Sequence, residues 1–365
     1  MITEFTEEQN ALREVVRGFL TDRSGEAAVR EVMATESGYD PGVWQTMAGQ
    51  MGLQSLAIPE EYGGQGFGWI ELGVVLEEMG RALLCAPYLS TVVLAATTLL
   101  EAGAGAKKRY LPGIADGSTI ATVAFPRSGG RYDVRAERSG DAWRLSGSAP
   151  LVIDGHVASL LLVAAQTPGG LGVFAVEAGA AGLSATPRPT LDQTRKLADV
   201  TLADTPAAVI IAPGKAEDVL ARVLDRAVVG LAAEQVGGAN AALDMGVAYM
   251  KERVQFGQPI GRFQALKHLA ADVLVEVETA RSAAYYALGA VAADDDEVQV
   301  AAPLAAAYCT DAYVTAAHQN IQFHGGMGFT WELPAHLYFK RARSSQLLFG
   351  EPARHRARVA ERLGI

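Results

Sequence analysis

The stretch from Glu252 to Gln264, with the sequence ERVQFGQPIGRFQ, carries residue types that suit a charged, flat ligand. Arg253 offers a permanently charged guanidinium, and two glutamine amides lie near the rings of Phe256 and Phe263. A planar fork of hydrogen-bond donors beside aromatic rings suits a phosphate or pyrophosphate that is joined to a flat base. At a helix junction an arginine usually forms a salt bridge and a phenylalanine usually fills the core. The residue types alone therefore leave open both a ligand-binding role and a structural role.

Two long helices must position this stretch. Apolar residues recur at three- and four-residue steps on both sides of it, which is the period of a helix face. They are Val219, Leu220, Val223, Leu224, Val228 and Leu231 before the stretch, and Leu266, Leu269, Val273 and Val277 after it. Gly257 and Pro259 end the first helix and set the entry to the second. The sequence therefore predicts a short polar loop between two long helices.

The composition bounds the class of protein. With 365 residues, of which 50% are hydrophobic and 20% charged, the chain predicts two or three domains with a substantial core. No apolar run reaches the ~18 residues of a membrane-spanning helix, and Met1–Phe5 lacks a basic region followed by an apolar stretch. We therefore expect neither a membrane span nor a signal peptide. A net charge of −10 argues against non-specific nucleic-acid binding, although local basic residues can still hold a phosphate-bearing ligand.

The two cysteines, Cys85 and Cys309, are far apart in apolar helical surroundings. Buried free thiols are therefore expected rather than a disulfide or a metal site. A cytoplasmic protein fits this pattern.

The periodicity of the chain changes twice. Residues 1–118 and 213–365 follow the helical period, and Thr6 and Gln9 stand in the positions of a capping box. Residues 119–212 alternate with the period of strands, which are predicted at 119–125, 142–147, 160–164, 172–176 and 198–202. The predicted fold class is thus α+β and mainly α, with an N-terminal helical domain (1–118), a middle antiparallel β-barrel or sandwich (119–212) and a C-terminal helical domain (213–365).

Two glycine-rich segments interrupt the helical sequence. Glycines 63, 64 and 66 could cradle a ligand's phosphate, but a plain loop is the simpler interpretation. In the second segment, Gln322–Phe329, Gly325 and Gly326 let backbone amides approach a phosphate because no Cβ stands in the way.

These segments resemble the motifs of the acyl-CoA dehydrogenase family. Residues 253–264 are similar to its signature loop R-x-x-F-G-x-x-I-x-x-F-Q, and Gln322–Phe329 is similar to its Q-x-x-G-G-x-G-F. The order of helices, strands and helices resembles that family's layout over the whole chain. The resemblance implies a four-helix bundle in the C-terminal domain.

The resemblance also implies FAD as the cofactor, bound across a subunit interface. In the family the matching Arg and Phe hold the pyrophosphate and adenine of the neighbouring subunit's FAD, and the Gln and second Gly contact its adenosine and pyrophosphate. His324 is then expected to be a satisfied interface histidine, and Arg341 and Arg343 to be solvated or interface charges rather than coenzyme A contacts. The cofactor-binding residues that the resemblance implies are Arg253, Gln255, Phe256, Ile260, Phe263, Leu266, Gln322, Phe323, Gly325 and Gly326.

The family's catalytic base is missing from its usual places. Family members oxidise an acyl-CoA thioester to the α,β-enoyl-CoA, and a desolvated Glu removes the α-proton while the β-hydride moves to FAD. Phe349 stands at the position of that Glu, and Ala227 stands at the alternative position that some members use. The nearest carboxylates are Asp225, Glu234 and Glu351. Glu351, one residue out of place, and Glu234, two helical turns or ~10 Å from Ala227, are the weak candidates, and a structural role is favoured for Glu234.

The residues that would hold the flavin ring are replaced as well. Leu151 and Ile153 stand where the family has an aromatic-x-Thr pair, and residues 124–130 keep only part of its T-E-P-x-x-G-S-D strand. The contacts given to a neighbour's FAD are intact, whereas those for the chain's own flavin ring are lost. This division indicates a chain that completes the site of another subunit.

The leading hypothesis is the non-catalytic subunit of a heteromeric acyl-CoA dehydrogenase. The chain resembles the paired actinobacterial enzymes that dehydrogenate CoA thioesters of steroid side chains as α2β2 tetramers with one FAD per heterodimer. The partner subunit would supply the base, the flavin pocket and the acyl-CoA cavity. Two alternatives stay open: a self-sufficient homotetrameric dehydrogenase or flavin oxidase that uses Glu351 or Glu234, and a non-enzymatic scaffold that binds acyl-CoA or a protein partner without flavin.

Overall fold

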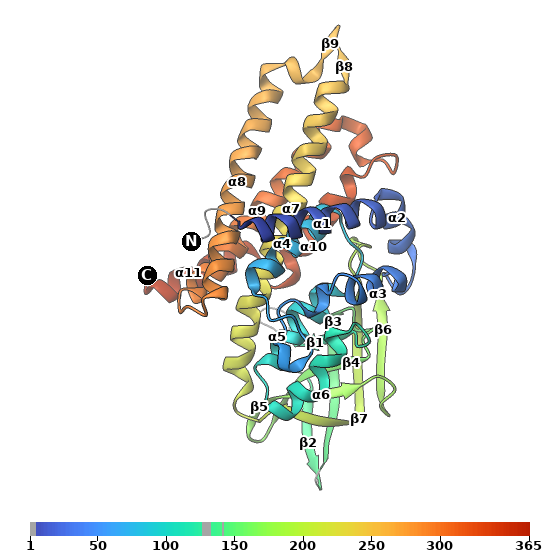
Figure 1. The fold of residues 1–365 in the computed structure, drawn as a ribbon, viewed down its shortest axis with the longest axis vertical. Helices are drawn as coiled ribbons and strands as arrows, with labels where there is room; N and C mark the ends of the chain where they lie inside the picture. The colour runs from blue at the N-terminus through green and yellow to red at the C-terminus, as the bar shows by residue number, and fades with distance from the viewer. Residues whose placement is uncertain (1–4, 126–132, 141) are drawn as a thin grey trace. The chain divides into compact units, whose positions relative to one another are not determined.

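The computed structural model describes residues 5–125, 133–140 and 142–365 (Figure 1). The expectations for Met1–Glu4 and for residues 126–130 lie outside the described residues. The helices are α1 (Glu7–Arg23), α2 (Glu26–Ala34), α3 (Pro41–Gly49), α4 (Trp69–Arg81), α5 (Ala96–Leu100), α6 (Ala104–Ala115), α7 (Ala216–Glu252), α8 (Gln264–Ala292), α9 (Val298–His324), α10 (Ala335–Leu348) and α11 (Pro352–Leu363). The strands are β1 (Ala121–Ala124), β2 (Arg135–Ser139), β3 (Ala142–Ile153), β4 (Leu160–Thr167), β5 (Gly170–Glu177), β6 (Leu183–Arg188), β7 (Leu197–Ile211), β8 (Val254–Gln255) and β9 (Gln258–Pro259).

The chain divides into two compact units. The first, here called the helical unit, comprises Met1–Arg30, Trp69–Leu84 and Val228–Ile365, and the second, the barrel unit, comprises Glu31–Gly68 and Cys85–Ala227. The helical elements of residues 1–118 are thus shared between both units, and α7 contributes to both. The three-domain division expected from the sequence stays a prediction.

The helical unit begins with the capping box that the sequence predicts. The Thr6 hydroxyl accepts from the backbone of Gln9 (3.2 Å), and the Gln9 side chain accepts from the backbone of Thr6 (3.0 Å). These two bonds satisfy donors that an isolated helix end leaves unpaired. Within this unit, α7 and α8 run side by side to the small hairpin of β8 and β9, as predicted for residues 252–264 (Figure 1).

The barrel unit holds a closed sheet. Its strands pair in the order β1-β4-β2-β3-β7-β5, and β5 pairs with β4 to close the ring, while β6 adds to β7. Alternate side chains point into a core that includes Leu145, Val163, Phe174 and Leu202. All five predicted strands are present, and the sheet is a barrel rather than a sandwich.

Two strands and two parallel pairings go beyond the sequence expectation. β2 is mostly polar, so its alternation signal is weak, whereas β6 alternates over only six residues and contains Pro187, which argues against a strand. The pairings of β1 and of β2 with β4 are parallel, so the sheet is mixed rather than purely antiparallel. Each of these pairings joins strands that are far apart in the sequence, so the pattern of residues within one strand does not predict them.

Three further findings bear on the sequence analysis. Cys85 and Cys309 are buried and form no disulfide, as expected, and burial raises the pKa of the Cys309 thiol to about 12. Among the described residues, no helix is long and apolar enough to cross a membrane. The same residues contain no group of His, Cys, Asp and Glu that could hold a metal ion.

Candidate functional site

The hairpin between α7 and α8 presents an unpaired arginine to solvent. The N–H of Arg253 donates to the carbonyl of Tyr249 (2.9 Å), and the Arg253 carbonyl accepts from Ile260 N–H (2.8 Å), which closes the loop at its base. The Arg253 guanidinium is exposed and makes no hydrogen bond or ion pair with any described residue. Gln255 is also exposed, and its amide donates to the carbonyl of Val254 (2.9 Å). The hairpin therefore carries a charge that the chain's own packing does not use.

The tip of this hairpin has a strained backbone. Phe256 and Gly257, between the paired residues Gln255 and Gln258, have φ angles of 53° and 75°, the signs that a type I′ turn requires. Glycine adopts this conformation freely, but a residue with a Cβ loses roughly 1–2 kcal/mol there. The Phe256 ring is nevertheless 91% exposed and meets Phe263 edge-on, with 6.0 Å between ring centroids. This exposure shows that Phe256 does not fill the core, and it favours a binding role for this residue.

The residues after the tip attach the hairpin to the helices. Ile260, Phe263 and Leu266 are half-buried, and Phe263 N–H donates to the Ile260 carbonyl (3.0 Å) at the start of α8. Gly261 lies against the end of α7, because a Cβ there would come within 2.9 Å of the Met250 carbonyl oxygen. These side chains form the base from which Arg253 and Phe256 project.

A second exposed segment follows the end of α9. Gln322, Gly325 and Gly326 are all exposed. Gly325 has φ 61° and ψ −144°, a region open essentially to glycine alone. A Cβ added at Gly325 or Gly326 would meet nothing within 4 Å, so open space lies beside this backbone. A phosphate could approach the main chain here without a clash.

The two neighbouring side chains of this segment face inward. The Phe323 ring is buried, and a Cβ at Gly246 of α7 would lie 2.7 Å from it, so the ring packs inside the helical unit rather than beside the other expected cofactor contacts. His324 is also buried, and its Nδ1–H donates to the Asn320 carbonyl (2.8 Å). His324 is therefore satisfied within the chain, as expected from the sequence.

Tyr249 joins the two segments. Its ring stacks on His324 with 4.1 Å between centroids, and its carbonyl holds the backbone of Arg253. Four residues of helix separate Tyr249 from Arg253, a rise of about 6 Å. One end of the helical unit thus holds both segments that are expected to contact FAD, residues 253–266 and residues 322–326. Tyr249 was not predicted from the sequence, and its spacing of four residues before Arg253 is the signal that could have found it.

Large apolar side chains extend this exposed surface. Met327, Phe329 and Trp331 are 39%, 72% and 57% exposed. The ammonium of Lys340 lies 4.5 Å from the Trp331 ring centroid, and His336 packs edge-on against the same ring at 4.6 Å. Burial and the charge of Lys340 lower the pKa of His336 to about 4, so this imidazole is neutral at pH 7. Apolar residues so exposed on one segment are typical of a surface that another chain covers.

The positions of the family's catalytic base hold no carboxylate. Phe349 is buried after the end of α10, and Ala227 is fully buried in α7. Glu351 precedes α11, where its backbone carbonyl accepts from Arg354 N–H (3.0 Å), and its side chain is exposed. The side chain of Glu351 therefore lacks the buried surroundings expected of the family's base. Asp225, the third nearby carboxylate, is buried within the barrel unit.

Glu234 takes part in a buried ion pair. Its carboxylate accepts from Arg341 Nη1 at 2.9 Å, and the two side chains are 8% and 4% exposed. The expectation that Arg341 is a solvated or interface charge is therefore wrong, because Glu234, 107 residues earlier, neutralises it inside the helical unit. Arg343 is exposed as expected and donates to Gln346 (2.6 Å). This arrangement favours the structural role for Glu234.

The flavin-ring positions of the barrel are apolar. Leu151 has φ 58° at an irregularity of β3, and its N–H donates to Asp199 (3.1 Å). Ile153 is buried, and its carbonyl accepts from the Thr122 hydroxyl (2.6 Å). Neither side chain brings a hydroxyl or an aromatic ring to this strand.

The loop with Gly63, Gly64 and Gly66 bonds to itself. The amides of Gly64 and Gly66 donate to the carbonyls of Pro59 (3.2 Å) and Ile58 (3.0 Å). These amides are not available to a phosphate, which agrees with a plain loop.

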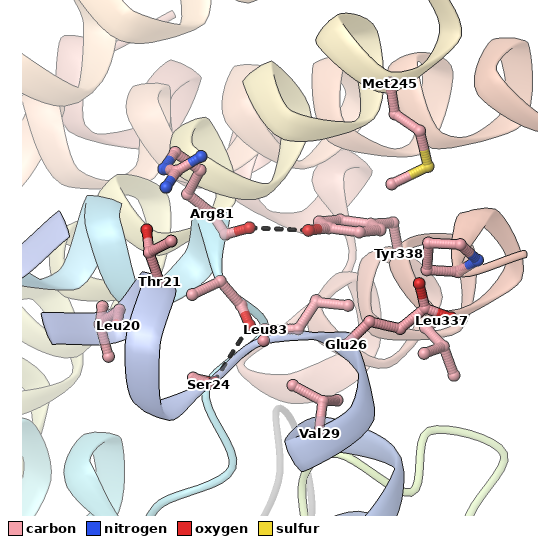
Figure 2. A pocket seen from close by; sticks show the side chains of 13 residues that line it. Leu20, Thr21, Ser24, Glu26, Val29, Arg81, Leu83, Met245, Leu337 and Tyr338 are labelled. Carbon is pink, nitrogen blue, oxygen red and sulfur yellow. Dashed lines mark hydrogen bonds between the residues drawn. The ribbon is translucent and has the colours of Figure 1, made fainter. Parts of the chain in front are cut away.

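Figure 2 shows an apolar cavity of the helical unit that the sequence did not reveal. Its volume is about 270 Å³, and its lining comes from α1, α2, the end of α4, α7 and α10. The Tyr338 hydroxyl donates to the Arg81 carbonyl (2.7 Å), and the Ser24 hydroxyl donates to the Ala82 carbonyl (3.3 Å). None of the expected site residues lines it, so the cavity is separate from the hairpin surface.

Comparisons with known proteins identify the family of this chain. The N-terminal domain of acyl-CoA dehydrogenases matches residues 6–118, and the C-terminal domain matches residues 218–364. Acyl-CoA dehydrogenase IpdE2 of Mycolicibacterium smegmatis is 35% identical over 354 residues, which cover 95% of this chain and 96% of that protein.

Two solved structures superpose along nearly the whole chain. One is a variant of the Tcur3481-Tcur3483 steroid ACAD, with a TM-score of 0.89, 34% identity and 98% of each chain covered. The other is the ChsE4-ChsE5 complex from Mycobacterium tuberculosis, with a TM-score of 0.91, 29% identity, and 100% of this chain and 99% of that chain covered. The matched domains, the fold and the two exposed motifs lead to one conclusion: this chain belongs to the acyl-CoA dehydrogenase family, a family of flavoprotein oxidoreductases.

Proposed function

We propose that this chain is a subunit that completes the FAD site of a second acyl-CoA dehydrogenase subunit, in an α2β2 heterotetramer whose catalytic Glu comes from the partner. One observation carries the proposal. The exposed hairpin holds a strained Phe256 and an unpaired Arg253, while a buried Phe349 stands where the base would be.

The residues at the hairpin fit the adenosine and pyrophosphate half of FAD. The Arg253 guanidinium would bind pyrophosphate oxygens, and the rings of Phe256 and Phe263 would contact the adenine. Gln322 and the open backbone at Gly325 and Gly326 would complete the contacts to adenosine and pyrophosphate. Gln255, Ile260 and Leu266 would support this surface from the hairpin and the start of α8. The buried Phe323 ring would support the same surface by packing against α7.

The partner would supply the flavin-ring pocket and the base. Bound FAD provides the hydride acceptor of the reaction. Leu151 and Ile153 bring no hydroxyl toward a flavin ring, and Phe349 and Ala227 cannot accept a proton. A chain with these residues gains activity only from a second subunit that carries the missing groups.

The substrate class follows from the relatives. An acyl-CoA thioester is the substrate of the family, and we propose a steroid side-chain CoA ester because a related structure is described as a steroid ACAD. The ChsE4-ChsE5 complex, which names two chains, supports a heteromeric assembly.

The test is the flavin content of this chain expressed alone and with a related subunit that carries the catalytic Glu. We expect FAD and dehydrogenase activity in the mixed complex alone, with one FAD for each pair of chains. Arg253→Ala should weaken FAD binding about 10- to 100-fold, because a charged hydrogen bond contributes roughly 1.5–3 kcal/mol. Fluorescence titration of the complex with FAD measures this change.

Arg354→Ala is the matched control, since Arg354 is also exposed and its side chain has no hydrogen-bond partner among the described residues. It should leave FAD affinity unchanged. A full FAD on every chain, with turnover by this chain alone, would contradict the proposal and direct attention to Glu351 and Glu234. A mixed complex without flavin would support the scaffold alternative.

A further inference from the structure

A second cavity of the helical unit is lined by charges. It lies where α1, α4, α7 and α8 meet, has a volume of about 430 Å³, and is more polar than the cavity of Figure 2. Its charged lining consists of Arg13, Arg17, Arg81, Arg281, Glu77 and Glu78. On α7 the lining reaches Gly237 and Asn240, which lie about 20 Å along the helix from the Arg253 hairpin. The cavity is therefore distinct from the proposed FAD surface.

Three of the four carboxylate oxygens of this cavity, both of Glu78 and Oε2 of Glu77, already accept hydrogen bonds from the protein. Glu78 accepts from Arg17 Nε (2.9 Å) and Nη2 (2.7 Å), from Arg81 Nε (3.1 Å) and from Arg13 Nη1 (3.3 Å). Glu77 accepts from Arg13 Nη2 (3.1 Å) and from the Tyr285 hydroxyl (2.7 Å). Burial would raise the pKa of Glu78, but the hydrogen bonds and charges of Arg17 and Arg81 outweigh it and lower this pKa. Both carboxylates are thus paired with arginines of the protein.

The arginines are not saturated. No described residue accepts from Nη1 or Nη2 of Arg81, or from Nη1 of Arg17. Arg281 donates through Nη2 to Asn240 (2.9 Å) and lies 3.5 Å from the half-exposed Glu278, but its buried Nε has no partner among the described residues. Burial raises the pKa of the Tyr285 hydroxyl, so Tyr285 brings no negative charge.

The Arg81 side chain points away from the apolar cavity. Its backbone carbonyl belongs to the apolar cavity, where it accepts from Tyr338, but Figure 2 shows its side chain directed away from Glu26 and Leu337. Arg81 also lines the charged cavity, where its Nε donates to Glu78 (3.1 Å). Four arginines and two arginine-bound carboxylates therefore line this cavity, and several of its donors have no acceptor among the described residues.

We propose that this cavity is a binding site for a tetrahedral, doubly charged oxyanion, a phosphate that is either free or part of a phosphate ester. Guanidinium groups bind such oxygens in pairs of parallel hydrogen bonds, and a dianion would balance the excess positive charge. The unpaired donors of Arg17, Arg81 and Arg281 would then have acceptors.

The experiment is isothermal titration of the full-length chain with inorganic phosphate, at constant ionic strength maintained with sodium chloride. We expect saturable binding at one site per chain. Arg17→Gln and Arg281→Gln should each raise the dissociation constant at least about tenfold, because each removes a charged guanidinium donor from the cavity. Titration with glycerol 3-phosphate separates the two sources: tighter binding than inorganic phosphate identifies an ester site, and equal binding identifies a site for the free ion.

Arg222→Gln is a closely matched control. Arg222 is 51% exposed and Arg17 is 49% exposed, and each donates through Nε and Nη2 to one glutamate, Glu101 for Arg222 and Glu78 for Arg17. Arg222→Gln should leave phosphate binding unchanged, and circular dichroism should show all three variants folded. Absence of saturable heat at millimolar phosphate would overturn the proposal. Equal affinity for acetate, or equal weakening by Arg222→Gln, would also overturn it.

Discussion

At the scale of single residues, Glu234 shows how packing assigns a role that spacing leaves open. The sequence presents it as a displaced carboxylate near the position of a catalytic base. In the helical unit it lies 2.9 Å from Arg341, and both side chains are buried. Taking two charges out of water is costly, so each is kept inside by the other.

We expect Glu234→Gln to destabilise the chain by about 3–5 kcal/mol, because it removes the carboxylate from a buried ion pair with Arg341. The double variant Glu234→Leu with Arg341→Met should recover most of that loss, since no unpaired charge remains. Urea unfolding measures both free energies. If Glu234→Gln instead abolished turnover of the mixed complex at unchanged stability, Glu234 would be the base and the structural assignment would fail.

At the scale of elements, the crossing of α4 and α7 depends on two glycines. A Cβ at Gly80 would lie 1.9 Å from the carbonyl oxygen of Glu234, and a Cβ at Gly237 would lie 1.8 Å from that of Glu77. The two helix backbones touch at this point, so no side chain fits between them. This close approach places Glu77 and Glu78 beside Gly237 and Asn240 at the charged cavity.

Gly80→Ala and Gly237→Ala should each lower the free energy of unfolding by about 2–4 kcal/mol, because the backbones must separate to admit the methyl group. Gly18→Ala is the control, since Gly18 lies in α1 with nothing within 4 Å of an added Cβ. That substitution should stabilise the chain by up to about 1 kcal/mol through helix propensity. Equal effects of all three substitutions in guanidinium unfolding would refute the proposed close crossing.

At the scale of the whole molecule, two buried histidines couple stability to pH. His336 and His355 are each 3% exposed. Burial, together with the charge of Lys340 for His336 and of Arg358 for His355, lowers each pKa to about 4. In the unfolded chain each imidazole binds its proton near pH 6.5, so the unfolded state gains protons first as the pH falls.

The free energy of unfolding should therefore be highest above pH 6.5 and should decrease between pH 6.5 and about 4, by roughly 3 kcal/mol for each histidine. His336→Gln should remove its share of this dependence. His268→Gln, at an exposed position, is the control substitution. Urea unfolding at several pH values gives the slope. A free energy independent of pH across this range would contradict the low pKa values.

Much of the fold could be predicted from the sequence because its signals are local. The capping box at Thr6, the strands between residues 119 and 212, and the turn between α7 and α8 each depend on residues a few positions apart. The short strands β2 and β6 escaped prediction because β2 is mostly polar and β6 contains a proline, and pairing partners hold both in the sheet.

The sequence by itself determined the family motifs, the order of the elements and the absence of a carboxylate at positions 349 and 227. Only the tertiary structure decided that Phe256 projects into solvent, that Phe323 packs inward, that Arg341 pairs with Glu234, and that arginines from α1, α4 and α8 share one cavity. The physical reason is the range of the interactions. Turn geometry and helix periodicity act over a few residues, whereas burial and ion pairing depend on neighbours that lie tens or hundreds of positions away in the chain.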